Sequence, residues 1–303
     1  MDRPQLKHLA LRAGLTAISL TAAAMALRVA LRGLDWPSFS SRLRDLDCRW
    51  LALAVLFDVL SYSAQGWRWR FLLPGSKVWK TTRAIYAGLF VNEILPLRPG
   101  EALRAWLAAR DLDIAVWKVV PTMVSERLLD GVWLVAALLA AVCLAPLPSG
   151  VTHAIWIAAT IAVALIAIAG LLGGRGGHFV QAVIAGSRNR PAVLLSAVFV
   201  LAQGLAFWAV VRASHLSVGV LGAFVVMTVV RVGTLIPGAP ANLGTHQFAT
   251  VMGLSLYGIP QAEAAAFSLI VFTVLTLPLL ALGFGACLSA GLTWRGLRQL
   301  PPS

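Results

Sequence analysis

The sequence predicts an all-α, polytopic membrane protein, and three observations lead to this fold class. Hydrophobic residues occupy 59% of the 303 positions and charged residues only 12%, whereas a soluble domain has about 25% charged residues. Eight apolar segments follow one another, and several reach the roughly 20 residues that span a bilayer. Two of these segments are interrupted near the middle by proline and glycine. Because so little polar surface remains, a large soluble protein with buried helices is excluded.

The net charge of +13 indicates contact with a membrane surface rather than with nucleic acid. The basic residues cluster between the apolar segments, where they set the orientation of the chain and attract anionic lipid headgroups. We therefore expect the membrane as a partner and no nucleic acid. Nothing in the sequence indicates the oligomeric state.

The first two elements stand apart from the rest of the chain. The N-terminal segment, about 10–31, resembles a signal peptide, but its apolar run is long and a polytopic chain follows, so an uncleaved first helix is predicted. The link 32–49 combines four arginines with three aspartates and has aromatic residues nearby. This composition predicts an amphipathic helix that lies at the membrane interface.

Six segments are continuous and are predicted to cross the membrane fully. Two others, about 81–113 and 217–258, are interrupted. The two longest continuous segments have room to tilt in the bilayer. The continuous segments lie at about 10–31, 50–66, 116–146, 151–172, 192–212 and 262–290.

The distribution of Lys and Arg predicts the orientation of these segments. The link 146–153 contains neither residue type and is expected outside, while the basic links and the C-terminal tail are expected in the cytoplasm. The links can alternate consistently between the two sides of the membrane only if each interrupted segment enters and leaves on the same side, as a re-entrant hairpin. Both termini then lie in the cytoplasm. The residues that set this orientation are Arg68, Arg70, Lys77, Lys80, Arg83, Arg175, Arg188, Arg190, Arg295 and Arg298.

The order of the segments predicts an inverted repeat within a single transmembrane domain, 1–303. A helix, an interrupted segment and a long helix form one trio at about 50–146, and a second trio of the same kind occupies about 192–290. The first trio begins outside and the second begins inside. Two trios of opposite orientation, each with a broken middle element, are typical of transporters.

The first interruption is the stretch 92–101, "NEILPLRPGE", which is polar although it lies in an apolar segment. Pro96 and Pro99 lack amide donors and disfavour a helix before them, so a helix is predicted to end near Leu95. Gly100 is expected to permit the dihedral angles with which a new helix begins near Glu101.

The restarted helix offers a site that suits a phosphate. Its N-terminus carries a partial positive charge and free N–H groups, and Arg98 and Arg104 add full charges. Irregular backbone at membrane depth needs hydrogen-bond partners for its free N–H and C=O groups, which either protein or a water-filled cavity must supply. A simpler alternative is that Glu101 and Arg104 pair across one helical turn.

The second interruption lies within 217–258. Thr245 is expected to cap the helix that restarts there. Arg231 stands in an apolar stretch with no carboxylate nearby in sequence, and an unpartnered arginine at membrane depth is a functional candidate. His246 is either a hydrogen-bonded structural histidine or a proton carrier. The residues expected to break the helix are Pro237, Gly238, Pro240 and Gly244.

The third polar stretch is "SERLLDGVW", 125–133. Glu126 and Asp130 are four residues apart and share one helix face, near the middle of the membrane. Carboxylates at that depth need cations or protons, so we expect at least one of them to pair with an arginine. A purely structural ion network is the alternative. The candidate arginines are Arg98, Arg104, Arg127 and Arg231.

The two interruptions are predicted to meet inside the bilayer and to form one hydrated, cation-rich pocket that binds the substrate. Side chains from both breaks and from the third polar stretch are expected to line it. The predicted set is Asn92, Glu93, Arg98, Glu101, Arg104, Glu126, Arg127, Asp130, Arg231, Asn242 and His246.

These motifs resemble the flippase-like family named for the transmembrane domain of lysylphosphatidylglycerol synthases. The stretches "NEILPLRPGEALRAWLAAR", "SERLLDG" and "IPGAPANLGTHQ" carry the resemblance, which covers about 15–290. Many members have a carboxylate just after the last glycine of the second turn, where this chain has Thr245, His246 and Gln247. The positions that match the family pattern are Asn92, Pro96, Arg98, Gly100, Glu101, Arg104, Glu126, Arg127, Asp130, Pro237 and Gly244.

The resemblance implies a polytopic protein of the bacterial inner membrane that moves a lipid or a lipid-linked glycan between leaflets. An anionic phospholipid or a polyprenyl- or glycolipid would be its substrate. The resemblance does not imply the synthase reaction, which belongs to a separate soluble domain in those enzymes.

Two other functions stay open. An ion-coupled secondary transporter of a small solute also fits an inverted repeat. A membrane enzyme that modifies lipids fits less well, because the sequence has no Asp-rich metal motif, no H-E-x-x-H and no G-x-S-x-G. We therefore expect no enzymatic activity, no metal site and no cofactor.

Overall fold

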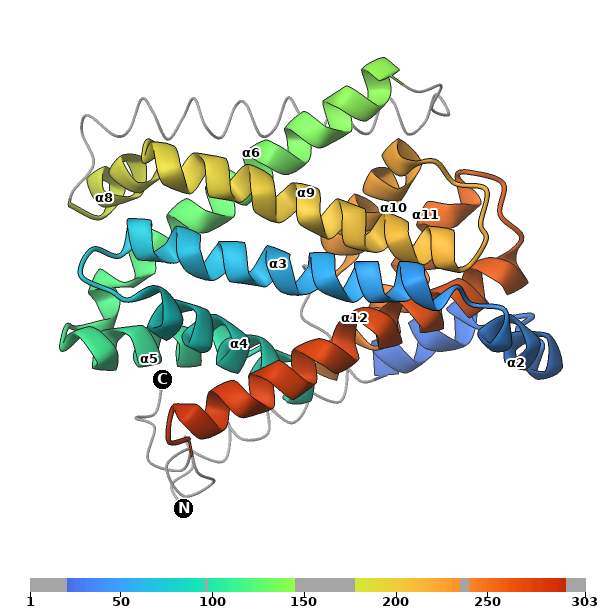
Figure 1. Ribbon diagram of the computed structural model, residues 1–303, viewed down its shortest axis with the longest axis horizontal. Coiled ribbons are helices and arrows are strands. Elements are labelled where there is room, and N and C mark those ends of the chain that lie inside the picture. Colours follow the sequence, from blue (N-terminus) through green and yellow to red (C-terminus); the bar gives the residue numbers. More distant parts are fainter. Residues whose placement is uncertain (1–20, 96–97, 145–177, 235–239, 293–303) are drawn as a thin grey trace, which may run out of the picture.

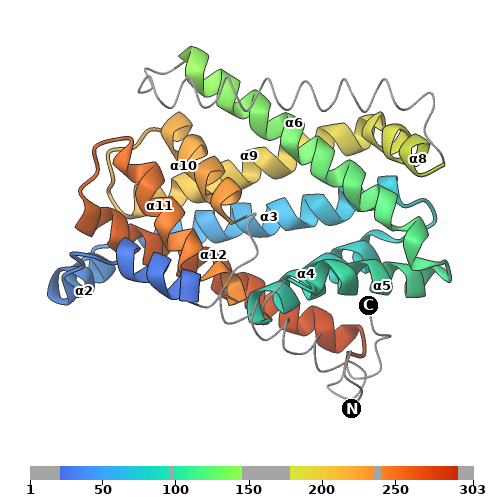
Figure 2. The same ribbon diagram turned by 180° about the vertical axis from the view of Figure 1, so that it is seen from behind.

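The computed structural model describes residues 21–95, 98–144, 178–234 and 240–292. Every secondary-structure element within these ranges is helical, so the predicted all-α class is confirmed for them. A helix at Thr21–Ala30 precedes the labelled elements. Figure 1 and Figure 2 show these elements, which are α2 (Trp36–Arg44), α3 (Cys48–Leu72), α4 (Val78–Ile94), α5 (Gly100–Leu112), η1 (Val116–Lys118), α6 (Val120–Leu144), α8 (His178–Ser187), α9 (Arg190–Ala213), α10 (Val220–Gly233), η2 (Pro240–Asn242), α11 (Thr245–Ser255) and α12 (Gln261–Ser289).

Four helices are much longer than the others, namely α3, α6, α9 and α12. α9 and α12 are long and apolar enough to cross a membrane. α3 and α6 have 25 residues each, which is about 37 Å at a rise of ~1.5 Å per residue, but both carry charged side chains. Only Thr21–Ala30 is described of the crossing predicted at 10–31, and the crossing predicted at 151–172 lies outside the described residues.

α3 and α9 lie side by side and run antiparallel. At one end the backbone N–H of Asp47, just before α3, donates to the carbonyl oxygen of Ala213 at 3.2 Å. At the other end the Asn189 side chain, just before α9, donates to the carbonyl oxygen of Phe71 at 3.3 Å. Fully buried small side chains such as Ala54 allow the two backbones to approach closely.

Both interrupted segments fold back on themselves as pairs of helices. α4 packs against α5, and α10 packs against α11. The base of the first hairpin, where α4 begins and α5 ends, lies at the end of the molecule where α3 terminates. The base of the second hairpin, where α10 begins and α11 ends, lies at the opposite end, where α9 terminates (Figure 1). The two helical hairpins inferred from the charge pattern are thus present, while their re-entry into a bilayer stays a prediction.

Each hairpin packs against a long helix from the other half of the chain. α4 contacts α12, and α10 contacts α6. In the same way α3 contacts α12, and α9 contacts α6. The contacts are therefore symmetric: they stay the same when α3 is exchanged with α9, α4 with α10, and α6 with α12. The short η2 helix of the second break also contacts α4, so the two breaks are neighbours.

The link 32–49 contains a helix shorter than the link itself. α2 spans Trp36–Arg44 and has no buried residue. Asp35 caps it by accepting hydrogen bonds from the hydroxyl and the backbone N–H of Ser38, and these bonds hold the pKa of Asp35 below its usual range. The position of α2 at a membrane interface stays a prediction.

Candidate functional site

A cavity of about 450 Å³ lies where the two breaks meet. Its walls come from α3, α4, α5 and α6 and from α9, α10, α11 and α12, and so from both predicted halves of the chain. Glu126 is the exception among the predicted residues, because its side chain is buried behind the wall. The predicted residues that line the cavity are Asn92, Glu93, Arg98, Glu101, Arg104, Arg127, Asp130, Arg231, Asn242 and His246.

A hydrogen bond joins the two breaks directly. Arg98 lies in the first break, where its backbone adopts a left-handed φ of 54°. Its guanidinium donates to the carbonyl oxygen of Thr234, at the end of α10, at 2.8 Å. The two interruptions therefore face one cavity, as the sequence predicts.

The first break depends on close packing between α4 and α5. α4 ends at Ile94 and α5 begins at Gly100, near the predicted positions. A Cβ atom on Gly100 would overlap the carbonyl oxygen of Gly88, and the Gly100 N–H donates to the Asn92 side chain at 2.7 Å. Gly100 is helical, and Arg98 takes the left-handed conformation. The expectation that Gly100 is needed for its backbone dihedral angles is therefore wrong. Glycine is required here because the backbones of α4 and α5 come into contact.

The second break turns through three residues with positive φ, which are Ala241 (56°), Asn242 (52°) and Gly244 (88°). Gly244 precedes α11, and its N–H donates to the Gln247 side chain at 2.7 Å. Thr245 is already the first helical residue, and its hydroxyl donates to the Asn242 carbonyl oxygen at 2.9 Å. The capping role expected for Thr245 is therefore wrong.

The prolines and glycines expected at the breaks are only partly described. Pro99 is the residue before α5, and Pro240 begins η2. Pro96, Pro237 and Gly238 lie outside the described residues. The two breaks are thus defined here by the helix ends on either side.

A buried ion cluster, which we call the Glu126 cluster, adjoins the cavity. Arg104 and Asp130 reach the cavity wall, whereas Glu126 and Arg68 lie behind it. Arg104 and Arg68 both pair with Glu126, the second at 2.7 Å. Arg68 also pairs with Asp130 and donates to the Ser196 hydroxyl at 3.0 Å. The expectation that a carboxylate of this helix pairs with one of the candidate arginines is confirmed by Arg104.

Arg68 is the member of this cluster that sequence reasoning missed. It was expected in a cytoplasmic link, but it lies within α3 and its side chain is fully buried. Asp58, Ser61, Gln65 and Arg68 follow one another at intervals of three and four residues on α3, and all four are buried. Polar residues at this spacing on a long apolar helix mark a face turned toward a protein interior, and this signal could have identified Arg68.

The pairs around Glu101 are more exposed than the Glu126 cluster. Arg127, whose side chain is 56% exposed, pairs with Glu101 and lies 4.0 Å from Asp130. Arg104 lies 3.7 Å from Glu101 on the same helix. The simple pair of Glu101 and Arg104 is therefore present, but as the outer part of a network that links α5 to α6.

Arg231 is held by polar groups that the sequence did not reveal. Its guanidinium donates to the side-chain amide oxygen (Oε1) of Gln203 at 2.6 Å. Gln203 in turn donates to Asp58 at 3.0 Å and to the Ser61 hydroxyl at 2.7 Å. The Arg231 guanidinium also lies 5.0 Å from the centre of the Phe199 ring. This chain of contacts crosses from α10 through α9 to α3.

The cavity wall is balanced in charge, so the expectation of a cation-rich pocket is wrong. The missed carboxylate of Asp58 completes the balance, which a site surrounded by apolar helices favours because net buried charge is costly. Within the described residues, however, Arg98 and Arg231 form no ion pair and donate only to neutral oxygens. The charged lining residues are Arg98, Arg104, Arg127 and Arg231 against Asp58, Glu93, Glu101 and Asp130.

Two polar side chains of the second break are incompletely bonded. The ring of His246 packs edge-on against Phe272, with 5.3 Å between ring centres. Within the described part of the chain, neither Nδ1 of His246 nor the side-chain oxygen of Asn242 has a hydrogen-bond partner. Buried atoms of this kind are commonly satisfied by water or by a ligand.

The fold and the cavity define a helical membrane protein with a polar site between two broken segments. The sequence model of the family described as lysylphosphatidylglycerol synthase TM region matches residues 16–283, and the chain belongs to this family. The resemblance seen in the motifs is thereby confirmed. No curated protein and no solved structure matches the chain.

Proposed function

We propose that this protein moves a phospholipid or a lipid-linked glycan between the leaflets of the bacterial inner membrane, and that it is not itself an enzyme. The anionic headgroup binds in the central cavity while the hydrocarbon chains stay in the bilayer. Both termini face the cytoplasm. The observation that carries the proposal is that two helix breaks, from hairpins at opposite ends of the molecule, line one polar cavity.

Arg98 and Arg231 are the residues we assign to the headgroup phosphate. Each donates to a neutral oxygen and, within the described residues, to no carboxylate. A phosphate offers full charge and bidentate geometry, so it competes well with a carbonyl oxygen for a guanidinium. Arg104 is already paired with Glu126, and Arg127 with Glu101, which leaves them less available.

The size of the cavity supports a headgroup as the occupant. Small-molecule sites enclose about 300–1,000 Å³, and this cavity encloses about 450 Å³. A glycerophosphate or sugar phosphate fits such a volume, whereas two long hydrocarbon chains do not. Translocation therefore requires that the chains remain in lipid while the headgroup crosses on polar side chains, which removes most of the cost of placing a charge in hydrocarbon.

The contact pattern supports an inverted repeat with the cavity at its centre. α3 and α9 are antiparallel, and each hairpin packs on a long helix of the opposite half. In inverted-repeat transporters the two halves exchange roles, so that a central site opens to one side and then to the other. A headgroup at this site would reach each leaflet in turn.

An ion-coupled transporter of a small solute is the second candidate. Asp58 favours it, because this carboxylate is buried and reaches Arg231 only through Gln203. Buried carboxylates in transporters often bind the coupling ion or proton. A solute transporter would accumulate a water-soluble compound in vesicles under a proton or sodium gradient, whereas a lipid translocase would not.

The test is translocation of headgroup-labelled lipids in vesicles that contain the purified protein. Lipids of the outer leaflet are quenched by an impermeant reagent, and the fraction protected over time reports movement between leaflets. We expect wild type to move at least one anionic lipid, and Arg98→Ala and Arg231→Ala to slow that movement strongly.

The matched control is Arg70→Ala, which removes an exposed arginine near the end of α3. It should translocate as wild type does. If Arg98→Ala and Arg231→Ala both move lipid at the wild-type rate, the assigned site is wrong. If no lipid moves but a solute accumulates under a gradient, the second candidate replaces the first.

A further inference from the structure

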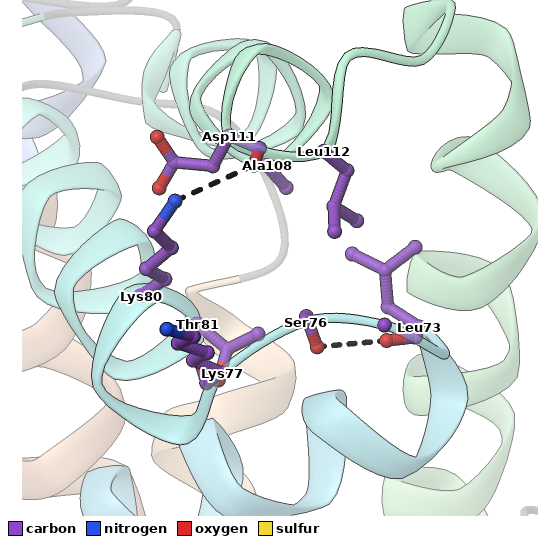
Figure 3. Close-up of a pocket in the computed structure, with 9 residues that line it drawn as sticks. Leu73, Ser76, Lys77, Lys80, Thr81, Ala108, Asp111 and Leu112 are labelled. Atoms are coloured by element: carbon purple, nitrogen blue, oxygen red, sulfur yellow. Dashed lines mark hydrogen bonds between the residues drawn. The ribbon is translucent and has the colours of Figure 1, made fainter.

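A second pocket lies at the base of the first hairpin, apart from the central cavity. It encloses about 180 Å³ between the turn that joins α3 to α4 and the last turns of α5 (Figure 3). The pocket is therefore bounded by both legs of the hairpin whose far end carries Arg98.

Two lysines bring positive charge to this pocket. Lys80 extends from α4 toward α5 (Figure 3), and its ammonium donates to the carbonyl oxygen of Asp111 at 3.4 Å, which is long for such a bond. The exposed side chain of Lys77 forms no hydrogen bond or ion pair among the described residues. The carboxylate of Asp111 does not neutralise these lysines, because Arg83 pairs with it at 2.7 Å and Arg110 lies 3.7 Å from it.

The backbone and the surrounding charges add to the positive potential. Lys77 precedes α4, and no side chain caps the N-terminus of that 17-residue helix, so its partial positive charge is directed at the same region. Asp113 is the other carboxylate at this end of α5, and it is exposed and forms no ion pair in the described part of the chain. The balance favours an anion.

The aromatic residues around the pocket are those of a membrane–water boundary. Trp79 is 56% exposed and lies beside the charged ends of Arg83 and Lys80, with 4.9 Å and 5.8 Å to the ring centre. At the same end of the molecule, Trp117 is 67% exposed and lies 5.7 Å from the Lys118 ammonium. Exposed tryptophans next to basic residues are typical of the headgroup level of a bilayer.

We infer that this pocket binds the phosphate of an anionic membrane phospholipid between Lys77 and Lys80. The lipid phosphate replaces the long contact of Lys80 with the Asp111 carbonyl oxygen and joins the turn before α4 to the end of α5. Binding therefore stabilises the base of the first hairpin. This site is separate from the proposed transport site and does not depend on translocation.

The experiment measures lipid retention by the full-length protein. Native mass spectrometry counts phosphatidylglycerol and phosphatidylcholine bound to protein released from mixed-lipid nanodiscs, and thermal unfolding is followed with each lipid present. We expect wild type to retain phosphatidylglycerol in preference to phosphatidylcholine and to melt at a higher temperature with it. We expect Lys77→Gln/Lys80→Gln to weaken phosphatidylglycerol binding roughly tenfold, because each lysine near an anionic headgroup contributes appreciably to its affinity.

The matched control is Arg188→Gln/Arg190→Gln, which removes two exposed charges from the turn between α8 and α9, beside the end of α3. It should bind phosphatidylglycerol as wild type does. Equal losses in the two double variants would overturn the pocket in favour of general surface charge. If inorganic phosphate at millimolar concentration displaces the lipid and gives the same thermal shift, the site is one for free phosphate and the lipid assignment is wrong.

Discussion

Two groups of charged side chains lie side by side in this fold and are held in different ways. In the Glu126 cluster each charge has an oppositely charged partner, and the Arg68, Glu126 and Asp130 side chains are only 0–6% exposed. At the two breaks, Arg98 and Arg231 line the cavity, and among the described residues they donate only to neutral oxygens. Arg68 and Glu126, at the centre of the first group, do not face the cavity, whereas Arg98 and Arg231 of the second group do.

This difference follows from solvation. A charge removed from water must be paired, because an unpaired ion in a low-dielectric interior costs several kcal/mol. A charge beside a hydrated cavity is satisfied by water, and a ligand can replace that water. The alternative of a structural ion network therefore describes Glu126 well, while the arginines at the breaks have the properties of a binding site.

The largest loss of stability is expected from Glu126→Ala. This change leaves Arg68 without its 2.7 Å partner and removes the direct partner of Arg104. Removing one member of a buried ion pair costs about 3–5 kcal/mol. Denaturant titration in detergent micelles, followed by circular dichroism, measures the free energy of unfolding. A loss of less than about 1 kcal/mol would mean that the cluster is hydrated, like an exposed pair, and the contrast with the cavity would disappear.

Arg231→Gln should show the opposite behaviour. The fold should remain as stable as wild type within about 1 kcal/mol, because Arg231 donates to the neutral Gln203 side chain and, in the described part of the chain, pairs with no carboxylate. Headgroup binding should weaken roughly tenfold to a hundredfold, since a hydrogen bond to a charged group contributes about 1.5–3 kcal/mol. Vesicle translocation and unfolding are measured on the same preparation. Normal translocation together with a large loss of stability would move Arg231 into the structural group.

Gly100→Ala should disturb both groups. A Cβ atom at this position would overlap the Gly88 carbonyl oxygen, and overpacking of this kind costs about 1–3 kcal/mol. The displaced start of α5 carries Arg104, so binding should fall as well. Gly131→Ala is the matched control, because nothing lies within 4 Å of its added Cβ atom. If both variants unfold at the same denaturant concentration, the close contact between α4 and α5 does not determine the stability of the fold.

The sequence predicted the positions of the breaks well, because proline and local polarity act on nearby backbone. The ends of the helices at Ile94 and Gly100 lie within one residue of those expected. The reason for Gly100 was not predictable in the same way. Its neighbour is Gly88, which belongs to the preceding helix, and a close approach between helices leaves no local signal.

The partners of the buried charges were only partly predictable. The pair of Glu126 and Arg104 was within the predicted set, since the number of cations in the apolar segments is small. Arg68 was missed because positive charge near the end of an apolar run is usually a sign of topology. Gln203 and Asp58 were missed because their roles depend on the packing of α9 against α3 and on the reach of Arg231.

The smallest effect is expected from Glu263→Gln. Glu263 pairs with Arg42 at 2.9 Å, but the two side chains are 27% and 44% exposed. Exposed pairs contribute about 0–1 kcal/mol, and screening at about 1 M salt should abolish even that contribution. The loss caused by Glu126→Ala should persist at the same salt concentration, because the side chains of the Glu126 cluster are buried and buried pairs are screened much less by salt. Should salt reduce both losses equally, the Glu126 cluster would be accessible to water, and pairing alone would no longer separate the structural charges from those that bind a ligand.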